Sequence, residues 1–150
     1  MYKIAINGFG RIGRNIVRAL YERPELQDKI KLVAINDLGS LEINAHLLQF
    51  DTVHGRFNQD VQVSENSLTI NGDVVNWSSE RNPADLPWGD LDVDLVCECT
   101  GVFTTREKAG LHIEAGAKKV IISAPGKEVD ATVVFGVNDD VLDGSQEIIS

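Results

Sequence analysis

Three glycines near the start of the chain have the spacing of a turn that binds a dinucleotide. The stretch reads Asn7-Gly8-Phe9-Gly10-Arg11-Ile12-Gly13-Arg14 and lies between an apolar run and a helical pattern. In such a turn Gly8 allows the chain to reverse sharply, Gly10 leaves room for a pyrophosphate, and Gly13 lets the helix lie close to the sheet. Because the first N–H groups of a helix are unpaired and carry the positive end of its dipole, they attract the phosphates.

A carboxylate follows the next expected strand. The apolar runs 2–6 and 30–35, with a helical pattern between them, form a β-α-β unit of about 30 residues. Asp37 comes directly after this unit, where it can accept hydrogen bonds from both hydroxyls of an adenosine ribose and repel a 2′-phosphate. Asp37 can instead cap a turn in Asn36-Asp37-Leu38-Gly39. The glycine turn upstream favours the ribose role.

Residues at the ends of later strands are further candidates. In a doubly wound sheet the ligand binds beyond the carboxyl ends of the strands. Thr100 and Gly101 follow the expected strand 93–99 and therefore fall where a dinucleotide would pass. Arg81, in a turn-rich bridge, can contact the adenine or can lie in solvent as an ordinary loop arginine.

The elements that would position these residues alternate along the chain. In the first helix Ile12, Ile16, Ala19 and Leu20 share the apolar face, and Arg18 falls largely off it. A second helix is expected over 41–48, and 51–57 mixes polar and turn residues. Three strands over 61–63, 68–70 and 74–77, the last two joined by an Asn-Gly turn, are expected to be partly exposed antiparallel hairpins. A helix over 105–115 capped by Thr104, and strands over 119–122, 132–135 and 147–149, complete the pattern.

These elements predict an α/β protein with a Rossmann-type, doubly wound, mostly parallel sheet and an inserted antiparallel hairpin region. The length of 150 residues fits one domain, and 43% hydrophobic and 25% charged residues are ordinary globular values. A formal charge of −9 argues against nucleic acid or an anionic membrane as a partner. The sequence shows neither a signal peptide nor an apolar run near the roughly 20 residues of a membrane helix, so we expect a soluble cytoplasmic protein.

Cysteine and histidine spacing does not predict a metal site. Cys97 and Cys99 would share one face of a strand, and without further cysteines they do not complete a zinc set. We expect both to be small buried strand residues. His46, His54 and His112 are scattered, and each is expected to be structural or exposed.

Eight motifs resemble, in order and interval, the amino-terminal half of the phosphorylating glyceraldehyde-3-phosphate dehydrogenase family. They are Asn7-Gly-Phe-Gly-Arg-Ile-Gly-Arg14, Asn36-Asp37, His54-Gly-Arg-Phe57, Glu80-Arg81, Thr100-Gly-Val-Phe103, Ala115-Gly-Ala-Lys-Lys119, Ser123-Ala-Pro125 and Gly136-Val-Asn138. The erythrose-4-phosphate dehydrogenases share most of these motifs. A domain of that enzyme therefore stays open as an alternative, as does a stand-alone nucleotide-binding module without catalytic descent.

The resemblance implies that the cofactor is NAD. With the glycine motif, it assigns the site to Asn7, Gly8, Gly10, Arg11, Ile12, Gly13, Asp37, Arg81, Thr100, Gly101 and Ser123. By the resemblance, Arg11 and Ile12 bind the pyrophosphate through main-chain N–H groups, and Ser123 lies near the nicotinamide ribose. Gly39-Ser40 resembles the glycine-containing loop of photosynthetic members that use both cofactors, so NADP is not excluded.

The family's nucleophilic cysteine would follow residue 150. The resemblance therefore implies that residues 1–150 form the NAD-binding domain, that the catalytic domain is absent from this chain, and that the chain alone has no catalytic residue and is inactive. It also implies that the parent protein is a glycolytic homotetramer. Such a parent oxidises glyceraldehyde 3-phosphate to 1,3-bisphosphoglycerate with NAD and phosphate.

Overall fold

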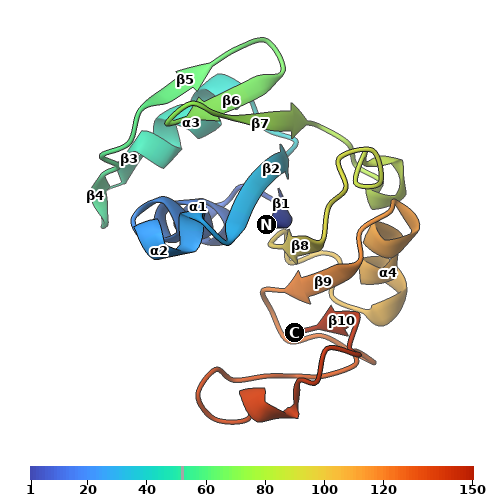
Figure 1. The fold of residues 1–150 in the computed structure, drawn as a ribbon. Helices are drawn as coiled ribbons and strands as arrows, with labels where there is room; N and C mark the ends of the chain where they lie inside the picture. Colours follow the sequence, from blue (N-terminus) through green and yellow to red (C-terminus); the bar gives the residue numbers. More distant parts are fainter. Residues whose placement is uncertain (52) are drawn as a thin grey trace.

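The computed structural model describes residues 1–51 and 53–150, which form alternating strands and helices (Figure 1). Thr52, in the expected polar and turn stretch, lies outside the described residues. The strands are β1 (Tyr2–Asn7), β2 (Ile30–Asn36), β3 (Phe50–Asp51), β4 (Gly55–Arg56), β5 (Val61–Val63), β6 (Ser67–Ile70), β7 (Asp73–Ser78), β8 (Leu95–Glu98), β9 (Lys119–Ile122) and β10 (Ile148–Ile149). The helices are α1 (Arg11–Tyr21), α2 (Pro24–Gln27), α3 (Leu41–Gln49) and α4 (Arg106–Glu114), with 3-10 turns η1 (Pro83–Asp85) and η2 (Asp139–Val141).

Eight of these strands form one sheet in the order β10-β9-β8-β1-β2-β7-β6-β5. All neighbours from β10 to β7 are parallel, and β7-β6 and β6-β5 are antiparallel. The predicted doubly wound, mostly parallel sheet is therefore confirmed. The hairpins extend this sheet at one edge, because β7 pairs in parallel with β2.

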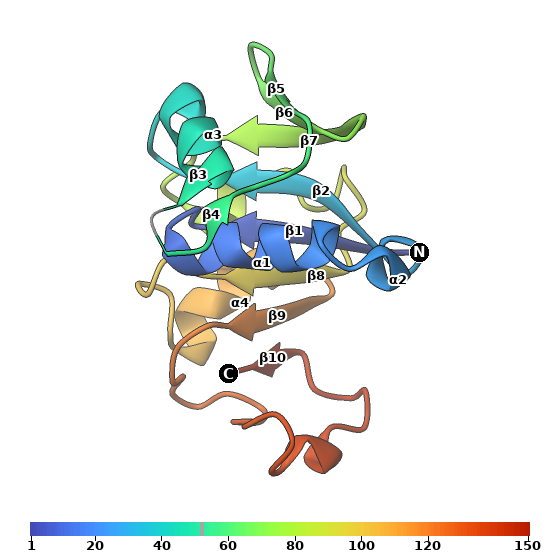
Figure 2. The ribbon, with the colours of Figure 1, turned by 90° about the vertical axis from the view of Figure 1, so that its left-hand side faces the viewer.

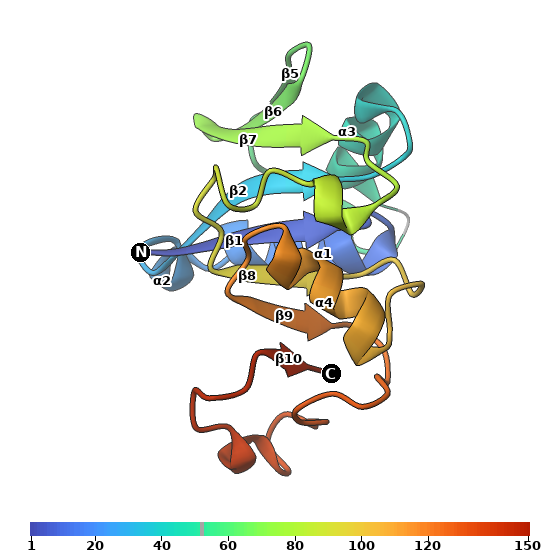
Figure 3. The same cartoon turned by 90° about the vertical axis from the view of Figure 1, so that its right-hand side faces the viewer.

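Helices cover both faces of the sheet. Figure 2 shows α1 in front of the strands, and Figure 3, from the opposite side, shows α4 in front. Each face has its own apolar cluster: Val17 and Leu20 of α1 pack with Ile6 on one side, and Ala109 of α4 packs with Val96 on the other. β1 is therefore buried on both faces, with its carboxyl end and the glycine turn at the edge where the site is expected.

The buried face of α1 differs from the predicted one. Ile12 is 50% exposed and Ala19 is also exposed, whereas Gly13, Val17 and Leu20 face the sheet. Arg18, expected off the apolar face, is only 4% exposed. Its guanidinium donates hydrogen bonds to the carbonyl oxygens of residues 48 and 55 and lies over the Phe57 ring. A buried arginine is tolerated here because these carbonyls satisfy its donors.

The hairpin strands are partly exposed, as predicted: Val63 and Val74 are exposed, whereas Leu68, Ile70 and Val75 are fully buried in the cluster on the α1 side. Two further expectations need correction. The strand expected over 132–135 does not form: the segment meets β10 through a bridge at residue 131 and a hydrogen bond from the Val133 N–H to the Ser150 carbonyl oxygen, and Phe135 is 92% exposed. α4 is capped one residue later than predicted, by Thr105, whose hydroxyl accepts the Lys108 N–H.

No helix within residues 1–51 and 53–150 has the length and apolar character needed to cross a membrane.

Candidate functional site

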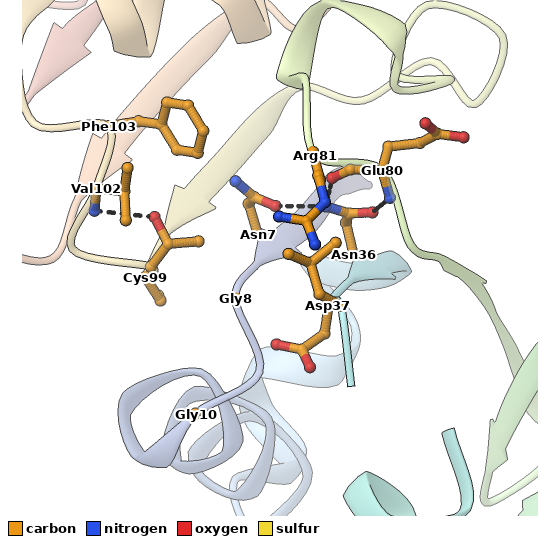
Figure 4. A pocket seen from close by; sticks show the side chains of 12 residues that line it. Asn7, Gly8, Gly10, Asn36, Asp37, Glu80, Arg81, Cys99, Val102 and Phe103 are labelled. Carbon is orange, nitrogen blue, oxygen red and sulfur yellow. Dashed lines mark hydrogen bonds between the residues drawn. The ribbon is translucent and has the colours of Figure 1, made fainter. Parts of the chain in front are cut away.

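A cavity of about 500 Å³ opens at the carboxyl ends of β1, β2 and β8. Figure 4 shows Val102 and Phe103 on one wall, Glu80 and Arg81 on the other, and the glycine turn between them. The lining residues are Asn7, Gly8, Gly10, Asn36, Asp37, Leu38, Glu80, Arg81, Cys99, Thr100, Val102 and Phe103. The cavity thus occupies the place where ligands bind to doubly wound sheets.

Each glycine of the turn has a different structural requirement. Gly8 has a φ of +92°, and a Cβ there would lie 2.8 Å from Thr100 Cγ2. A Cβ on Gly13 would lie 2.4 Å from the Gly8 carbonyl oxygen, so this position needs a glycine for helix packing. A Cβ on Gly10 would meet no atom within 4 Å. Since Gly10 also lines the cavity, the space beside it is available to a ligand.

The start of α1 is suited to an anion. The first turn, residues 11–14, contains no acidic residue and carries Arg11 and Arg14. Arg14 Nη1 donates to the Phe9 carbonyl oxygen at 3.0 Å, so it braces the glycine turn. Unpaired N–H groups and the helix dipole at this end favour negative charge. Together with the open space beside Gly10, this surface can accommodate a pyrophosphate.

Asp37 lines the cavity and also holds the glycine turn. Its Oδ1 accepts the Phe9 N–H at 2.8 Å, and its Oδ2 accepts the Gly39 N–H at 2.9 Å. The Phe9 ring packs edge to face against Trp77, with a centroid distance of 5.8 Å. The capping role considered from sequence is therefore present. The carboxylate nevertheless remains at the cavity wall, and its contact with Phe9 was not predicted.

The structure brings six of the eleven predicted site residues to the cavity wall: Asn7, Gly8, Gly10, Asp37, Arg81 and Thr100. Of the other five, Gly13 packs against the turn, Arg11 and Ile12 are exposed on the first turn of α1, and Gly101 is exposed next to Thr100 without lining the cavity. Ser123 is exposed and lines a separate apolar hollow beside residues 132–135. The roles of these residues toward a cofactor stay predictions.

Several lining residues were not assigned from sequence, including Asn36, Leu38, Glu80 and Cys99. Position at or just after a strand's carboxyl end is the signal that could have found Asn36 and Cys99. Asn36 Nδ2 donates to Asn7 Oδ1 at 2.8 Å and to the Glu80 carbonyl oxygen at 2.9 Å. It therefore connects the floor of the cavity to the loop that carries Arg81.

The two cysteines do not have the properties of nucleophiles. Both are half-buried, and burial raises the pKa of the Cys97 thiol to about 12 and that of Cys99 to about 11. At neutral pH both therefore stay protonated, and the thiolate is the reactive form. Among the described residues, no group of three metal-ligating side chains comes together.

Comparison with known proteins decides the family. Residues 2–106 match the family model described as "Glyceraldehyde 3-phosphate dehydrogenase, NAD binding domain". The chain belongs to this family. Its cofactor is accordingly NAD, as the sequence predicted, and the open Gly10 wall, the helix start and the Asp37 carboxylate fit that group.

The glyceraldehyde-3-phosphate dehydrogenase relatives match along nearly the whole chain. The chromosomal enzyme of Cupriavidus necator is 58% identical over 149 residues, which is 99% of this chain and 44% of that protein. The Pseudomonas aeruginosa enzyme is 56% identical over 148 residues, with the same coverage. Glyceraldehyde-3-phosphate dehydrogenase 1 of Bacillus subtilis is 51% identical over 149 residues, covering 99% of this chain and 43% of the relative. The chain thus spans less than half the length of these relatives.

Proposed function

We propose that NAD lies across the cavity, with its pyrophosphate on the glycine turn. The main-chain N–H groups of Arg11 and Ile12 would bind the phosphates, helped by Asn7, Gly8, Gly10 and Gly13, which shape the turn. Asp37 would hold the adenosine ribose and Arg81 the adenine side. Thr100 and Gly101 would line the opposite half, and Ser123 would lie near the nicotinamide ribose. The observation that carries the proposal is the open space beside Gly10, between Asp37 and Thr100.

We infer that the whole protein is a phosphorylating NAD-dependent dehydrogenase. It would oxidise glyceraldehyde 3-phosphate to 1,3-bisphosphoglycerate and act as a cytoplasmic homotetramer. Residues 1–150 would be the NAD-binding domain, and residues outside them would supply the nucleophile. When bound, NAD supplies the hydride acceptor, and this chain binds it, orients it and walls it off from water.

The comparisons favour this function over the two alternatives. The similar proteins are named glyceraldehyde-3-phosphate dehydrogenases at 49–58% identity, which supports that substrate over erythrose 4-phosphate. Membership of a dehydrogenase family also argues against a stand-alone nucleotide-binding module without catalytic descent.

Asp37→Asn tests the placement of the adenosine ribose. The amide keeps an acceptor for the Phe9 N–H but removes the negative charge. We expect NAD affinity to fall about tenfold, because hydrogen bonds to a charged group are worth about 1.5 kcal/mol or more. NADP affinity should fall less or rise, because repulsion of the 2′-phosphate is relieved. Calorimetric titration of both cofactors measures the two effects.

Asp60→Asn is the matched control for Asp37→Asn, because it removes the same charge from an exposed residue next to the β5 hairpin. It should leave both affinities unchanged. Equal NAD affinity for Asp37→Asn and the parent chain would remove Asp37 from the site.

The 150-residue chain by itself should not oxidise the aldehyde. With glyceraldehyde 3-phosphate, NAD and phosphate at saturation, we expect no NADH, because a bound cofactor does not replace a missing nucleophile. NADH absorbance measures the reaction. Turnover by highly purified chain would contradict this prediction. Cys97→Ser and Cys99→Ser would then show whether either thiol is responsible.

A further inference from the structure

A buried carboxylate lies directly beneath the cavity without lining it. Glu98, the last residue of β8, is 1% exposed. Its Oε1 accepts from Asn7 Nδ2 at 2.6 Å and contacts His112 Nε2 at 2.9 Å. Its Oε2 accepts from the Thr100 N–H at 2.9 Å and from the Thr100 hydroxyl at 2.6 Å. Burial of a carboxylate is costly unless it is paired in this way.

The proton positions in this cluster follow from Trp88. An indole N–H can only donate, and Trp88 Nε1 lies 2.9 Å from His112 Nδ1. His112 Nδ1 is therefore the acceptor, which assigns the proton of a neutral imidazole to Nε2. His112 Nε2 then donates to Glu98. Each of the four groups around the carboxylate is a donor, so Glu98 is an acceptor only.

Because Glu98 only accepts hydrogen bonds, it sets the orientation of the side-chain amides along the cavity floor. Asn7 turns its Nδ2 toward Glu98, which leaves its Oδ1 to accept from Asn36 Nδ2 at 2.8 Å. Asn36 Oδ1 in turn accepts the Glu80 N–H at 2.8 Å and the Ser78 hydroxyl at 3.0 Å. Figure 4 shows the Asn7-Asn36 link. One directed network thus joins the carboxyl ends of β8, β1, β2 and β7.

We propose that Glu98 is a positioning residue for the cofactor, acting through Asn7 and Thr100. Both partners line the cavity, and Glu98 fixes them before the ligand arrives. Thr100 lies across the glycine turn from Asp37, so through Thr100 Glu98 acts mainly on the nicotinamide half of the cleft. This inference rests on the proposed placement of NAD.

Glu98→Gln is the sharpest test, because glutamine has the same shape but accepts hydrogen bonds at only one of its two terminal atoms. If its NH₂ replaces Oε2, the Thr100 N–H is left without an acceptor. If its NH₂ replaces Oε1, it faces His112 Nε2–H, and Trp88 prevents that imidazole from moving its proton to Nδ1. One donor therefore loses its acceptor in either orientation: the Thr100 N–H at the cavity wall, or the buried His112 Nε2–H.

Calorimetric titration of NAD and ADP against both proteins measures the effect on each half of the cleft. We expect NAD to bind about tenfold more weakly to Glu98→Gln, because at least one of the hydrogen bonds that hold Asn7 and Thr100 in place is lost or disturbed. ADP, which carries only the adenosine half and the phosphates, should lose affinity by a clearly smaller factor than NAD, because it does not extend to Thr100, which Glu98 holds with two hydrogen bonds. Ile70→Val is the control. It removes one methyl group from the buried core on β6 and should lower the melting temperature without changing either affinity.

The outcomes separate the two proposals. A parent chain that binds neither ligand overturns the proposed NAD site. A parent that binds both, with Glu98→Gln binding NAD as tightly, overturns only the role of Glu98. Equal losses of NAD and ADP affinity also overturn it, since the change would then disturb the whole site.

Amide hydrogen exchange of the parent chain without NAD gives a second test that does not depend on the variant folding. The Thr100 amide should exchange at least tenfold more slowly than the exposed Gly101 amide, because Glu98 already holds it. Equal exchange at the two positions would show that Thr100 is not held in advance and would overturn the proposal.

Discussion

Gly10→Val is expected to fold and to lose NAD binding. A Cβ at this position meets no protein atom within 4 Å, so the side chain costs the free protein little. Valine is a poorer N-cap than glycine, and the loss of stability should be about 1 kcal/mol or less. The branched side chain would stand in the space beside the start of α1 that we assign to the pyrophosphate. NAD affinity should fall by at least a hundredfold in calorimetric titration.

Gly10→Ala should weaken NAD binding to a smaller extent, because one methyl group fills less of the same space. Its affinity should lie between those of the parent and Gly10→Val, with a melting temperature close to the parent's. If Gly10→Val folded and bound NAD as tightly as the parent, the open space beside Gly10 would not be the phosphate site.

Gly13→Ala should destabilise the fold itself. The added Cβ would lie 2.4 Å from the Gly8 carbonyl oxygen and 3.2 Å from Ile6 Cγ2, so α1 must move away from β1. Overpacking of this kind costs about 2–3 kcal/mol, which corresponds to a melting temperature roughly 4–12 °C lower. Thermal unfolding followed by circular dichroism measures the shift.

Gly110→Ala is the matched control for Gly13→Ala, and it is expected to have the opposite effect on stability. Gly110 lies within α4, and a Cβ there meets no atom within 4 Å. Alanine is favoured over glycine inside a helix by about 1 kcal/mol, so this variant should be as stable as the parent or more stable. If both alanine variants raised the melting temperature, the close contact between α1 and the glycine turn would not require a glycine at position 13.

The sequence allowed the parallel sheet and the glycine turn to be predicted because both depend on local spacing. Apolar runs placed β1, β2, β8 and β9, and the turn residues placed the ends of these strands at one edge. The strand expected over 132–135 failed for a non-local reason. Its residues favour an extended chain, but a strand needs a neighbour to pair with, and β10 beside it is only two residues long, so the pairing does not continue past Val133.

The polar contacts of the site were beyond sequence reasoning. Asn7 and Glu98 are 91 residues apart, and a pattern of residue types does not reveal that they share a hydrogen bond. Arg18 was misplaced for the same reason, since its acceptors are carbonyl groups at residues 48 and 55. Asp37 shows the intermediate case: its position was predicted, and its hold on Phe9 appeared only in the fold.

The contact between Phe9 and Trp77 makes the glycine turn optically observable. The chain has two tryptophans, and they have unlike surroundings: Trp88 is fully enclosed, whereas Trp77 is half-buried with its ring against Phe9. A shift of the turn changes the packing around the Trp77 indole and hence its fluorescence emission. The native protein therefore carries its own label at the turn, and ligand arrival can be followed by stopped-flow fluorescence without attaching a dye.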